Sequence, residues 1–308
     1  MRVVILGGSG FIGRALTRSL AGDGHEVVIV SRGAPRAAVG GVSFAPFDAR
    51  SGAGWRESLD GADALVNLAG ENIASGYWTA SRKRRILESR LAAGRAVMDA
   101  LASVASRPAV LVQGSATGYY GDRGDIPAAE DAPVGRGFLA EVAEKWEAST
   151  AEAEALGVRR AVARTAVVLD SHGGALPRML APFRFFAGGP LGSGKQWFPW
   201  IHLADEVRAI RFLLECPEAH GPYNLAAPGA VTQKGLAQAI GGALSRPAWL
   251  RTPETALRLL LGEMAQELFL NGVRAVPERL TRLGFAFLFP TLTAALADLL
   301  GGSDPVHA

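Results

Sequence analysis

A glycine-rich loop near the start of the chain connects a short apolar run to an amphipathic stretch. The apolar run Val3–Leu6 has the length of a buried strand, and Ile12–Ala21 has the apolar spacing of a helix. A strand that turns within a few glycines into a closely packed helix opens many parallel α/β sheets. The loop is Gly7-Gly8-Ser9-Gly10-Phe11-Ile12-Gly13, which contains both the G-x-x-G-x-x-G and the G-x-G-x-x-G spacing.

Apolar runs and amphipathic stretches continue to alternate through the first 170 residues. This order predicts βαβ units and a parallel sheet covered by helices on both faces. We therefore expect an α/β fold with a Rossmann-type, doubly wound parallel sheet. The expected strands are Val3–Leu6, Val27–Val30, Val42–Phe44, Ala64–Leu68, Ala109–Gln113 and Ala161–Val168, and the expected helices are Ile12–Ala21, Ser81–Ser103 and Phe138–Leu156.

The amino-acid composition of the sequence changes from residue 173 onward. Residues 173–200 are rich in glycine, proline and aromatic residues, which predicts a long loop. Loops of this length are often functional. This one offers a cation and aromatic stacking faces to a phosphorylated or ring-shaped substrate, from Lys195, Gln196, Trp197 and Trp200.

Helical patterns return in the last part of the chain. We expect residues 1–228 to form one Rossmann domain that includes the substrate loop. Residues 229–308 are expected to form a small, mostly helical C-terminal lobe over the carboxyl edge of the sheet. Its expected helices are 233–244, 253–270, 277–283 and 292–300.

Composition and charge describe an ordinary globular protein. Hydrophobic residues make up 49% of the chain and charged residues 20%, which is typical neither of a disordered protein nor of a disulfide-rich one. The net charge is only +3, and the basic run Arg82–Arg85 is too short for a nucleic-acid surface, so we expect no nucleic-acid partner. The single cysteine, Cys216, excludes an internal disulfide and favours the cytoplasm.

No apolar run approaches the roughly 18 residues that a membrane-spanning helix needs, so we expect a soluble protein without a membrane span. The histidines show no metal-ligand spacing, and no metal site is expected.

The glycine loop has the spacing that dinucleotide-binding sheets use for a pyrophosphate. The glycines let the backbone approach the phosphates, and the free N–H groups at the start of the next helix donate to them. The pattern therefore predicts cofactor contacts from all seven residues between Gly7 and Gly13. The alternative is a glycine turn that holds no ligand.

The end of the second expected strand distinguishes the two nicotinamide dinucleotides. Proteins that bind NAD usually carry Asp or Glu about 20 residues after the glycines, where it binds the ribose 2′-hydroxyl. Here the strand ends in Ser31 and Arg32, with no acid. Arg32 can pair with a 2′-phosphate and Ser31 can donate a hydrogen bond to it, so we predict NADP(H) rather than NAD(H). The alternative is an arginine that is solvated in a turn.

Two further strand ends lie at the edge where a dinucleotide would bind. Asp48 follows the third strand and can either accept a hydrogen bond from the adenine amino group or cap the next turn. The fourth strand ends in Asn67-Leu68-Ala69-Gly70. Its small residues let the backbone pass beside the dinucleotide, so Leu68, Ala69 and Gly70 are expected cofactor contacts.

The glycine loop and the Asn-Leu-Ala-Gly strand end resemble the short-chain dehydrogenase/reductase superfamily, specifically its extended branch of sugar-nucleotide epimerases and reductases. Gly114–Asp122 and Trp200–Asp205 are similar to the serine-rich strand end and the His-x-x-Asp segment of that branch. The chain is still more similar to a subgroup of nucleoside-diphosphate-sugar epimerases with a C-terminal helical region, whose signatures resemble residues 67–72, 114–121 and 189–197.

The resemblance to this subgroup covers nearly the whole chain. It implies cofactor contacts near Leu68, Ala69, Arg85 and Arg90, and at the backbone of Val168.

The catalytic pattern of the superfamily is incomplete in this sequence. Most members use a Tyr-x-x-x-Lys pair, whose lysine lowers the pKa of the tyrosine, and a nearby serine that holds the substrate oxygen. The helix that should carry the pair has Phe138 and Val142 at these positions. Its lysine is expected to be solvated, since Lys145 stands on a polar side together with Glu141, Glu144 and Glu147.

Hydroxyl groups at the end of the fifth strand are the catalytic candidates. Ser115 is expected to bind the substrate oxygen, and Tyr119 or Tyr120 can reach the same carbonyl and act as acid or base. The alternative is that one tyrosine packs under the nicotinamide and the other in the core. His202 and Asp205 suggest a proton relay, but a structural cap at a helix start is the favoured interpretation.

These observations favour an NADP(H)-dependent oxidoreductase or epimerase-like enzyme that acts on a carbonyl or hydroxyl group of a small, nucleotide-sugar-like substrate. The alternative is a non-catalytic NADP(H)-binding protein with a regulatory or partner-stabilising role, which the missing Tyr-x-x-x-Lys pair favours. The sequence leaves the substrate, the direction of the reaction and the oligomeric state open.

Overall fold

The structure is a computed structural model that describes residues 1–33 and 38–301. Residues 302–308, the end of the predicted C-terminal lobe, lie outside the described part. The chain divides into two compact units, each built from separate stretches of sequence. The first contains Met1–Tyr119, Glu141–Arg164 and Val207–Tyr223, and the second contains Tyr120–Ala140, Thr165–Glu206 and Asn224–Ala308.

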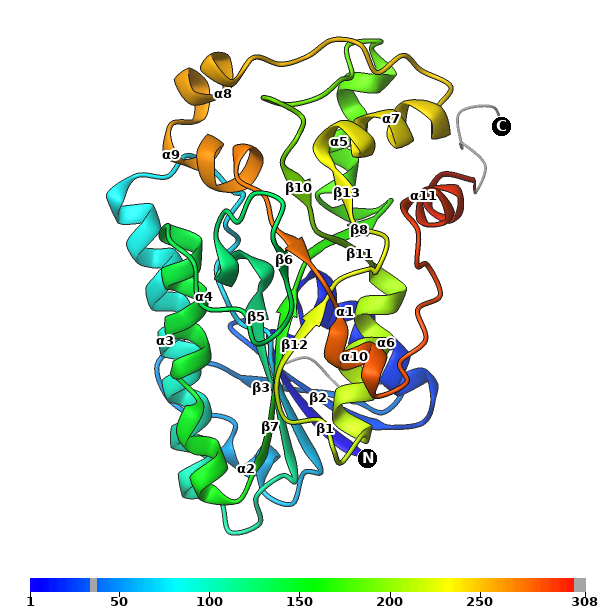
Figure 1. The fold of residues 1–308 in the computed structure, drawn as a ribbon. Coiled ribbons are helices and arrows are strands. Elements are labelled where there is room, and N and C mark those ends of the chain that lie inside the picture. Colours follow the sequence, from blue (N-terminus) through cyan, green and yellow to red (C-terminus); the bar gives the residue numbers. More distant parts are fainter. Residues whose placement is uncertain (34–37, 302–308) are drawn as a thin grey trace. The chain divides into compact units, whose positions relative to one another are not determined.

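A seven-stranded sheet, most of it in the first unit, carries the glycine loop (Figure 1). Its strands are β1 (Arg2–Leu6), β2 (Glu26–Ser31), β3 (Val42–Pro46), β4 (Ala64–Asn67), β5 (Val110–Ala116), β7 (Arg159–Thr165) and β12 (Gly221–Leu225). The strand order is β12-β7-β5-β4-β1-β2-β3. The pairs of β1 with β2 and β4, of β2 with β3 and of β4 with β5 are parallel. The predicted Rossmann-type sheet is therefore confirmed.

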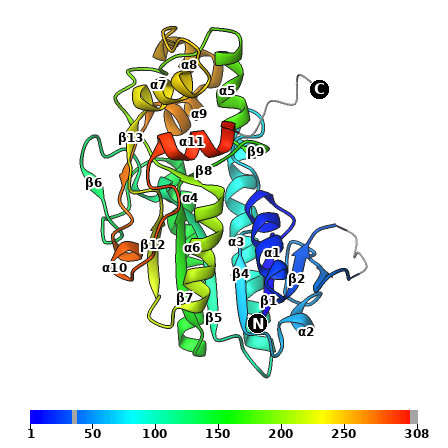
Figure 2. The same cartoon turned by 90° about the vertical axis from the view of Figure 1, so that its right-hand side faces the viewer.

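Four helices cover the two faces of this sheet, α1 (Phe11–Gly22) and α6 (Leu203–Glu215) on one and α3 (Ala80–Ser103) and α4 (Phe138–Ala148) on the other (Figures 1 and 2). Arg211 Nη1 of α6 donates a hydrogen bond to Ser19 Oγ of α1 at 2.8 Å, which joins the first pair. In the second pair, a Cβ at Gly94 would lie 2.0 Å from Ser149 Oγ. Glycine is therefore required where α3 meets the end of α4.

The strands are apolar because helices bury them on both sides. Val3 to Leu6 are 0% exposed, and one buried cluster joins the sheet to the inner face of α3. Its members include Val4, Leu6, Val28, Leu65, Ala96, Val97, Leu101 and Leu111.

The second unit has its own sheet and core. Its three-stranded sheet has the order β11-β8-β9, from strands β11 (Trp200–His202), β8 (Val167–Asp170) and β9 (Gly173–Gly174). A buried cluster joins this sheet to α5 (Leu176–Arg184), α7 (Gln233–Ala243) and α11 (Leu292–Gly301). Its members include Leu169, Leu180, Trp200, Leu236, Ile240 and Leu296.

Shorter elements complete the described chain. Two small sheets pair β6 (Pro127–Ala128) with β14 (Arg274–Ala275) and β10 (Trp197–Phe198) with β13 (Val231–Thr232). The remaining helices are α2 (Arg56–Leu59), α8 (Glu254–Leu261), α9 (Glu263–Ala265), a π-helical turn at Gln266–Leu270, α10 (Glu278–Arg282) and 3-10 turns at Thr117–Tyr120 and Ala151–Leu156. Within residues 1–33 and 38–301, no helix is both long and apolar enough to cross a membrane.

Four predictions about secondary structure are wrong. The expected strand Ala161–Val168 is divided between β7 and β8, which belong to different sheets. The expected helix Phe138–Leu156 is α-helical only to Ala148, and a separate 3-10 turn follows it. Residues 173–200 are not one loop, because β9, α5 and β10 lie within them and β11 begins at Trp200; α5 even contains Pro182. The expected helix 253–270 is interrupted at Gly262, whose φ of +57° no helical residue adopts. The expected helices 233–244, 277–283 and 292–300 are confirmed, with no end shifted by more than one residue.

Arg159 holds the last turn of α6. Its guanidinium donates hydrogen bonds to the carbonyl oxygens of Leu213 (3.0 Å), Leu214 (2.8 Å) and Ala219 (2.5 Å). These carbonyls lie at the end of the helix and beyond it, where backbone acceptors lack intrahelical partners. Burial lowers the pKa of Arg159, so the desolvated cation depends on these acceptors.

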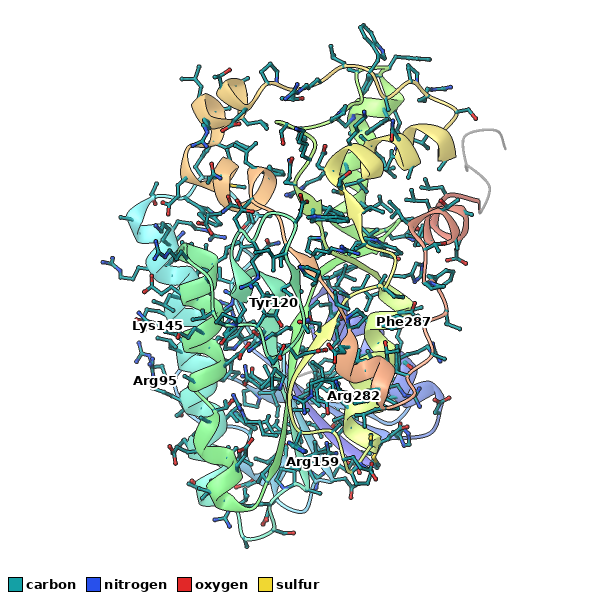
Figure 3. The ribbon with its side chains drawn as sticks, in the orientation of Figure 1. Arg95, Tyr120, Lys145, Arg159, Arg282 and Phe287 are labelled. Carbon is teal, nitrogen blue, oxygen red and sulfur yellow. The ribbon has the colours of Figure 1, made fainter. Side chains whose placement is uncertain are left out.

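Replacing Arg159 by methionine is expected to lower the free energy of unfolding by about 2 kcal/mol, because buried carbonyls lose a charged donor. Urea denaturation at pH 7 measures the change. Arg95→Met on α3 is the matched control, since the Arg95 side chain is 62% exposed and pairs with Glu88 only at 3.7 Å; it should cost less than about 0.5 kcal/mol. Both arginines are labelled in Figure 3. Equal effects of the two substitutions would show that α6 does not need this contact.

Candidate functional site

The glycine loop lies against the end of β4 and under the first turn of α1. Gly7 has a φ of +87°, and a Cβ there would lie 2.9 Å from the backbone nitrogen of Ala69. A Cβ at Gly13 would lie 2.4 Å from the carbonyl oxygen of Gly7. Both positions therefore require glycine, and the turn is as tight as pyrophosphate binding needs.

The start of α1 is suited to an anion. Gly10 is the N-cap residue, no side chain caps the helix, and its first turn contains no acidic residue. The first N–H groups of a helix lack intrahelical acceptors and carry a partial positive charge. Arg14, which sequence analysis did not single out, donates from Nη1 to the carbonyl oxygen of Ser9 at 2.7 Å. A cation at this end of a helix is unfavourable by itself, but it fits a loop that binds phosphates.

Arg32 follows β2 at the same edge of the sheet. Its side chain is exposed and has no hydrogen-bond or ion-pair partner within the described residues, and Ser31 before it is half-buried. Residues 34–37, which follow, are outside the described part. An exposed arginine with no acid beside it fits a 2′-phosphate better than a ribose 2′-hydroxyl.

Asp48 caps the turn that follows β3. Its Oδ1 accepts hydrogen bonds from the backbone nitrogens of Arg50 (2.7 Å) and Ser51 (2.8 Å), and its Oδ2 accepts from Ser51 Oγ (2.9 Å). The N–H groups of Ser51 and Arg50 lower the pKa of Asp48. Of the two roles that the sequence left open, the structure contains the turn cap; the adenine contact remains a prediction.

The segment after β4 is held in place by arginines of α3. Leu68 and Ala69 are half-buried and Gly70 is exposed, and a Cβ at Gly70 would lie 3.0 Å from Cζ of Arg90. Arg90 Nη1 donates to the carbonyl oxygens of Glu71 (3.1 Å) and Ile86 (2.9 Å). Burial lowers the pKa of Arg90 to about 10, while Glu71 acts in the opposite direction.

The basic run at the start of α3 is partly internal. Arg82 is only 8% exposed, forms an ion pair with Glu71 and donates to Ser75 Oγ and to the carbonyl oxygen of Asn72. Arg85 is exposed and lies 3.4 Å from Glu71. Arg82 thus orders the loop between β4 and α3 rather than adding to a charged surface.

Ser115 at the end of β5 belongs to a buried polar cluster. Ser115 Oγ donates to Glu147 Oε1 at 2.6 Å. Arg164 Nε donates to the same oxygen at 2.8 Å, and its Nη2 donates to Glu147 Oε2 at 2.9 Å. The Arg164 guanidinium also lies over the ring of Tyr119, 3.6 Å from the centroid. The structure thus brings together two predicted residues, Ser115 and Tyr119, and adds an ion pair that was not predicted.

Glu147 was expected on the polar side of its helix, and this is wrong. Its side chain is 13% exposed, whereas the neighbouring Glu141 and Lys145 side chains are 51% and 49% exposed. Glu147 follows the buried Ala140 and Ala143 by seven and four residues, and this spacing places it on their face. Lys145 points to solvent, as predicted, and pairs with Glu141 at 2.6 Å (Figure 3).

Tyr120 is in the core of the second unit (Figure 3). It is 0% exposed, and its hydroxyl donates to Asn224 Oδ1 at 2.7 Å. Asn224 in turn donates from Nδ2 to the carbonyl oxygens of Ala128 (3.0 Å) and Val276 (2.9 Å). This placement favours the core role for Tyr120 and leaves Tyr119 as the tyrosine near Ser115.

His202 caps the start of α6, in agreement with the favoured interpretation. Its Nδ1 accepts a hydrogen bond from the backbone nitrogen of Ala204 at 3.0 Å, so the ring hydrogen is on Nε2, 3.2 Å from Asp298. Burial lowers the pKa of His202. Asp205 does not cap this helix; it accepts from the backbone nitrogens of Leu288 and Phe289, both at 2.8 Å.

The residues proposed for a substrate loop have different surroundings. Trp200 is 1% exposed in the core of the second unit, and Nε1 donates to the carbonyl oxygen of Gly229, so the expectation of a stacking face is wrong for it. Gln196 donates to the carbonyl oxygens of Leu191 and Phe269. Lys195 is exposed and Trp197 is half-buried. Val168, which was expected to contact the cofactor, lies in β8 of the second unit and is 8% exposed.

Two family models match the chain. A model of the NAD dependent epimerase/dehydratase family matches residues 3–226. A second model, described as a domain of unknown function (DUF1731), matches residues 252–299. Among similar proteins, epimerase family protein YfhF of Bacillus subtilis is 37% identical, over 99% of this chain and 100% of its own length.

Solved structures of similar proteins share the fold. The structure of human epimerase family protein SDR39U1 (isoform2) with NADPH has a TM-score of 0.87 and 35% identity, and the match covers 98% of this chain and 100% of that chain. A nucleoside-diphosphate sugar epimerase from Corynebacterium glutamicum has a TM-score of 0.79 and 32% identity, over 98% of this chain and 58% of that chain.

Proposed function

The chain belongs to the NAD dependent epimerase/dehydratase family, and from this premise we propose that it binds NADP(H) and acts on a hydroxyl or carbonyl group of a small substrate. The observation that supports the cofactor comes from one edge of the first unit's sheet. There, a glycine turn with no room for a Cβ at Gly7 or Gly13 lies beside strand β2, which is followed by an exposed Arg32 and no acid. The NADPH in the structure of the human relative supports the same choice.

The residues of the first unit divide into two roles. The turn from Gly7 to Gly13 and the N-terminus of α1 would hold the pyrophosphate, with Arg14 adding charge, and Ser31 and Arg32 would hold the 2′-phosphate. Residues 68–70, held by Arg90, would line the path of the dinucleotide. When bound, the nicotinamide supplies or accepts a hydride. Ser115 and Tyr119 would contact the reacting group of the substrate.

A non-catalytic NADP(H)-binding protein is the second candidate, and Phe138 and Val142 at the positions of the usual tyrosine and lysine favour it. A panel of nucleotide sugars and small carbonyl compounds, each with NADPH, and of the matching alcohols with NADP⁺, separates the two. Turnover that depends on the Ser115 hydroxyl supports the enzyme. NADPH binding without turnover of any compound on the panel supports the non-catalytic alternative.

Replacing Arg32 by alanine should weaken NADPH binding about tenfold and leave NADH binding unchanged, because only NADPH carries the 2′-phosphate that a charge-assisted hydrogen bond would hold. Titration of the purified protein with each nucleotide, followed by nicotinamide fluorescence, gives both dissociation constants.

The matched control for this measurement is Arg18→Ala, which removes an exposed arginine from α1 and should change neither constant. If the wild-type protein binds both nucleotides equally, or if Arg32→Ala weakens both by the same factor, Arg32 does not select the cofactor.

A further inference from the structure

The hydroxyl hydrogen of Ser115 already forms a hydrogen bond within the protein, to Glu147. Glu147 forms a two-point ion pair with Arg164, whose Nε and Nη2 donate to different carboxylate oxygens at 2.8 and 2.9 Å. A carboxylate in such a pair is ionised and can only accept hydrogen bonds. In the 2.6 Å contact between Ser115 Oγ and Glu147 Oε1, the serine is therefore the donor.

A hydroxyl has one hydrogen and two lone pairs. Because the hydrogen is directed at Glu147, Ser115 Oγ has only acceptor capacity left. A substrate carbonyl oxygen is also an acceptor and cannot form a hydrogen bond with it. A substrate hydroxyl is a donor and can.

The cluster is held so that it cannot easily be rearranged. The Arg164 and Glu147 side chains are 4% and 13% exposed, and Ser115 is 5% exposed. The backbone carbonyl of Glu147 accepts from Arg160, which also donates from Nε to Thr150 Oγ1 at 3.1 Å. Releasing the serine hydrogen would leave a buried carboxylate with one acceptor site unfilled, which is unfavourable.

We propose that Glu147 is a positioning residue that fixes Ser115 as a hydrogen-bond acceptor, so that the site binds the hydroxyl form of its substrate in preference to the carbonyl form. The proposal rests on the proposed function, in which Ser115 contacts the reacting group. It adds that the reacting group is an alcohol. It also identifies the residue that selects the alcohol as Glu147, which lies on the helix from which the usual tyrosine and lysine are missing.

The test compares alcohols and carbonyl compounds of the same skeleton. The probes are cyclohexanol with cyclohexanone and benzyl alcohol with benzaldehyde, added to protein saturated with tetrahydro-NADP, a nicotinamide analogue that cannot transfer hydride. Ligand-detected NMR gives the dissociation constants, so the readout is binding and not turnover. In at least one pair, wild-type protein should bind the alcohol about tenfold more tightly than the carbonyl compound. Binding of neither probe of any pair, or an equal or reversed preference in every pair, overturns the proposal.

Variants show whether Glu147 is the cause. The double substitution Glu147→Met with Arg164→Met removes both buried charges, which avoids leaving either one unpaired, and frees the serine hydrogen; the preference should shift toward the carbonyl probe. Ser115→Ala keeps the ion pair and should bring the two probes within about twofold of each other. Glu144→Met, at an exposed position of the same helix, should behave as wild type. An unchanged alcohol preference in Ser115→Ala, or in the folded double variant, overturns the proposal.

The failure of this proposal and that of the proposed function are distinguishable. NADPH binding is measured first, without any probe, and its absence contradicts the proposed function directly. Tight NADPH binding combined with a carbonyl preference contradicts only the role of Glu147.

Discussion

Replacing Gly13 by alanine should weaken NADPH binding about a hundredfold. A methyl group there would lie 2.4 Å from the carbonyl oxygen of Gly7 and 2.7 Å from Cα of Gly8. Both are backbone atoms, so no side chain can move aside, and either α1 or the glycine turn must shift. A shift of either changes the distance between the helix N-terminus and the phosphates, on which the proposed binding depends. Titration with NADPH by nicotinamide fluorescence gives the dissociation constant.

The control is another glycine of the same helix. Gly22 is the last residue of α1, and a Cβ there meets no atom within 4 Å in the described structure. Gly22→Ala should leave the dissociation constant within twofold of the wild-type value and raise the stability slightly, because alanine favours helices. Unchanged NADPH binding in Gly13→Ala would contradict the assignment of this turn to the pyrophosphate.

Replacing Glu206 by glutamine should stabilise the protein by about 5 kcal/mol at pH 9 and by much less at pH 5. Glu206 is 0% exposed; its Oε1 accepts from Thr165 Oγ1 at 2.8 Å, and its Oε2 has no hydrogen-bond partner within the described residues. Burial raises the pKa of Glu206 to about 8. The folded protein therefore holds a proton that the unfolded chain releases near its ordinary pKa.

The sign of the pH dependence follows from the raised pKa. The contribution of Glu206 to stability is fully present below the unfolded pKa, near 4.5, and is lost as the pH rises from there to about 8. Glutamine does not titrate, so the variant keeps its stability over this range. Urea denaturation at several values between pH 5 and 9 measures the difference between the two proteins.

Glu215→Gln, on the same helix with a half-exposed side chain, is the control. Its stability relative to wild type should stay nearly constant over the same pH range. A constant difference between Glu206→Gln and wild type would show that Glu206 titrates in the folded protein as an exposed carboxyl does.

The parts of the fold that were predicted correctly are those whose signal is local. Val3–Leu6 and its neighbours are continuous apolar runs because helices bury both sheet faces, and the glycine turn follows from the space around Gly7 and Gly13. The resemblance to the epimerase branch of the short-chain dehydrogenase/reductases was predicted from the same segments and is confirmed.

The errors concern features that depend on tertiary contacts. β12 was not expected, since it begins with Gly221 and Pro222 and becomes a strand by pairing at the sheet edge. Helix α5 was not expected because Pro182 lies inside it. Glu147 and Arg82 carry charges that are typical of a surface, and only their partners, Arg164 and Glu71, account for their burial.

The position of β12 has a consequence for synthesis of the chain. β7, its neighbour in the sheet, ends at Thr165, and β12 begins at Gly221. At a usual translation rate, roughly 3 to 11 s separate the appearance of the two strands. During that time β7 presents an unpaired edge, which is the kind of surface that pairs with other chains. A nascent chain interrupted before residue 221 would therefore be prone to aggregate, although most of its sheet is already made.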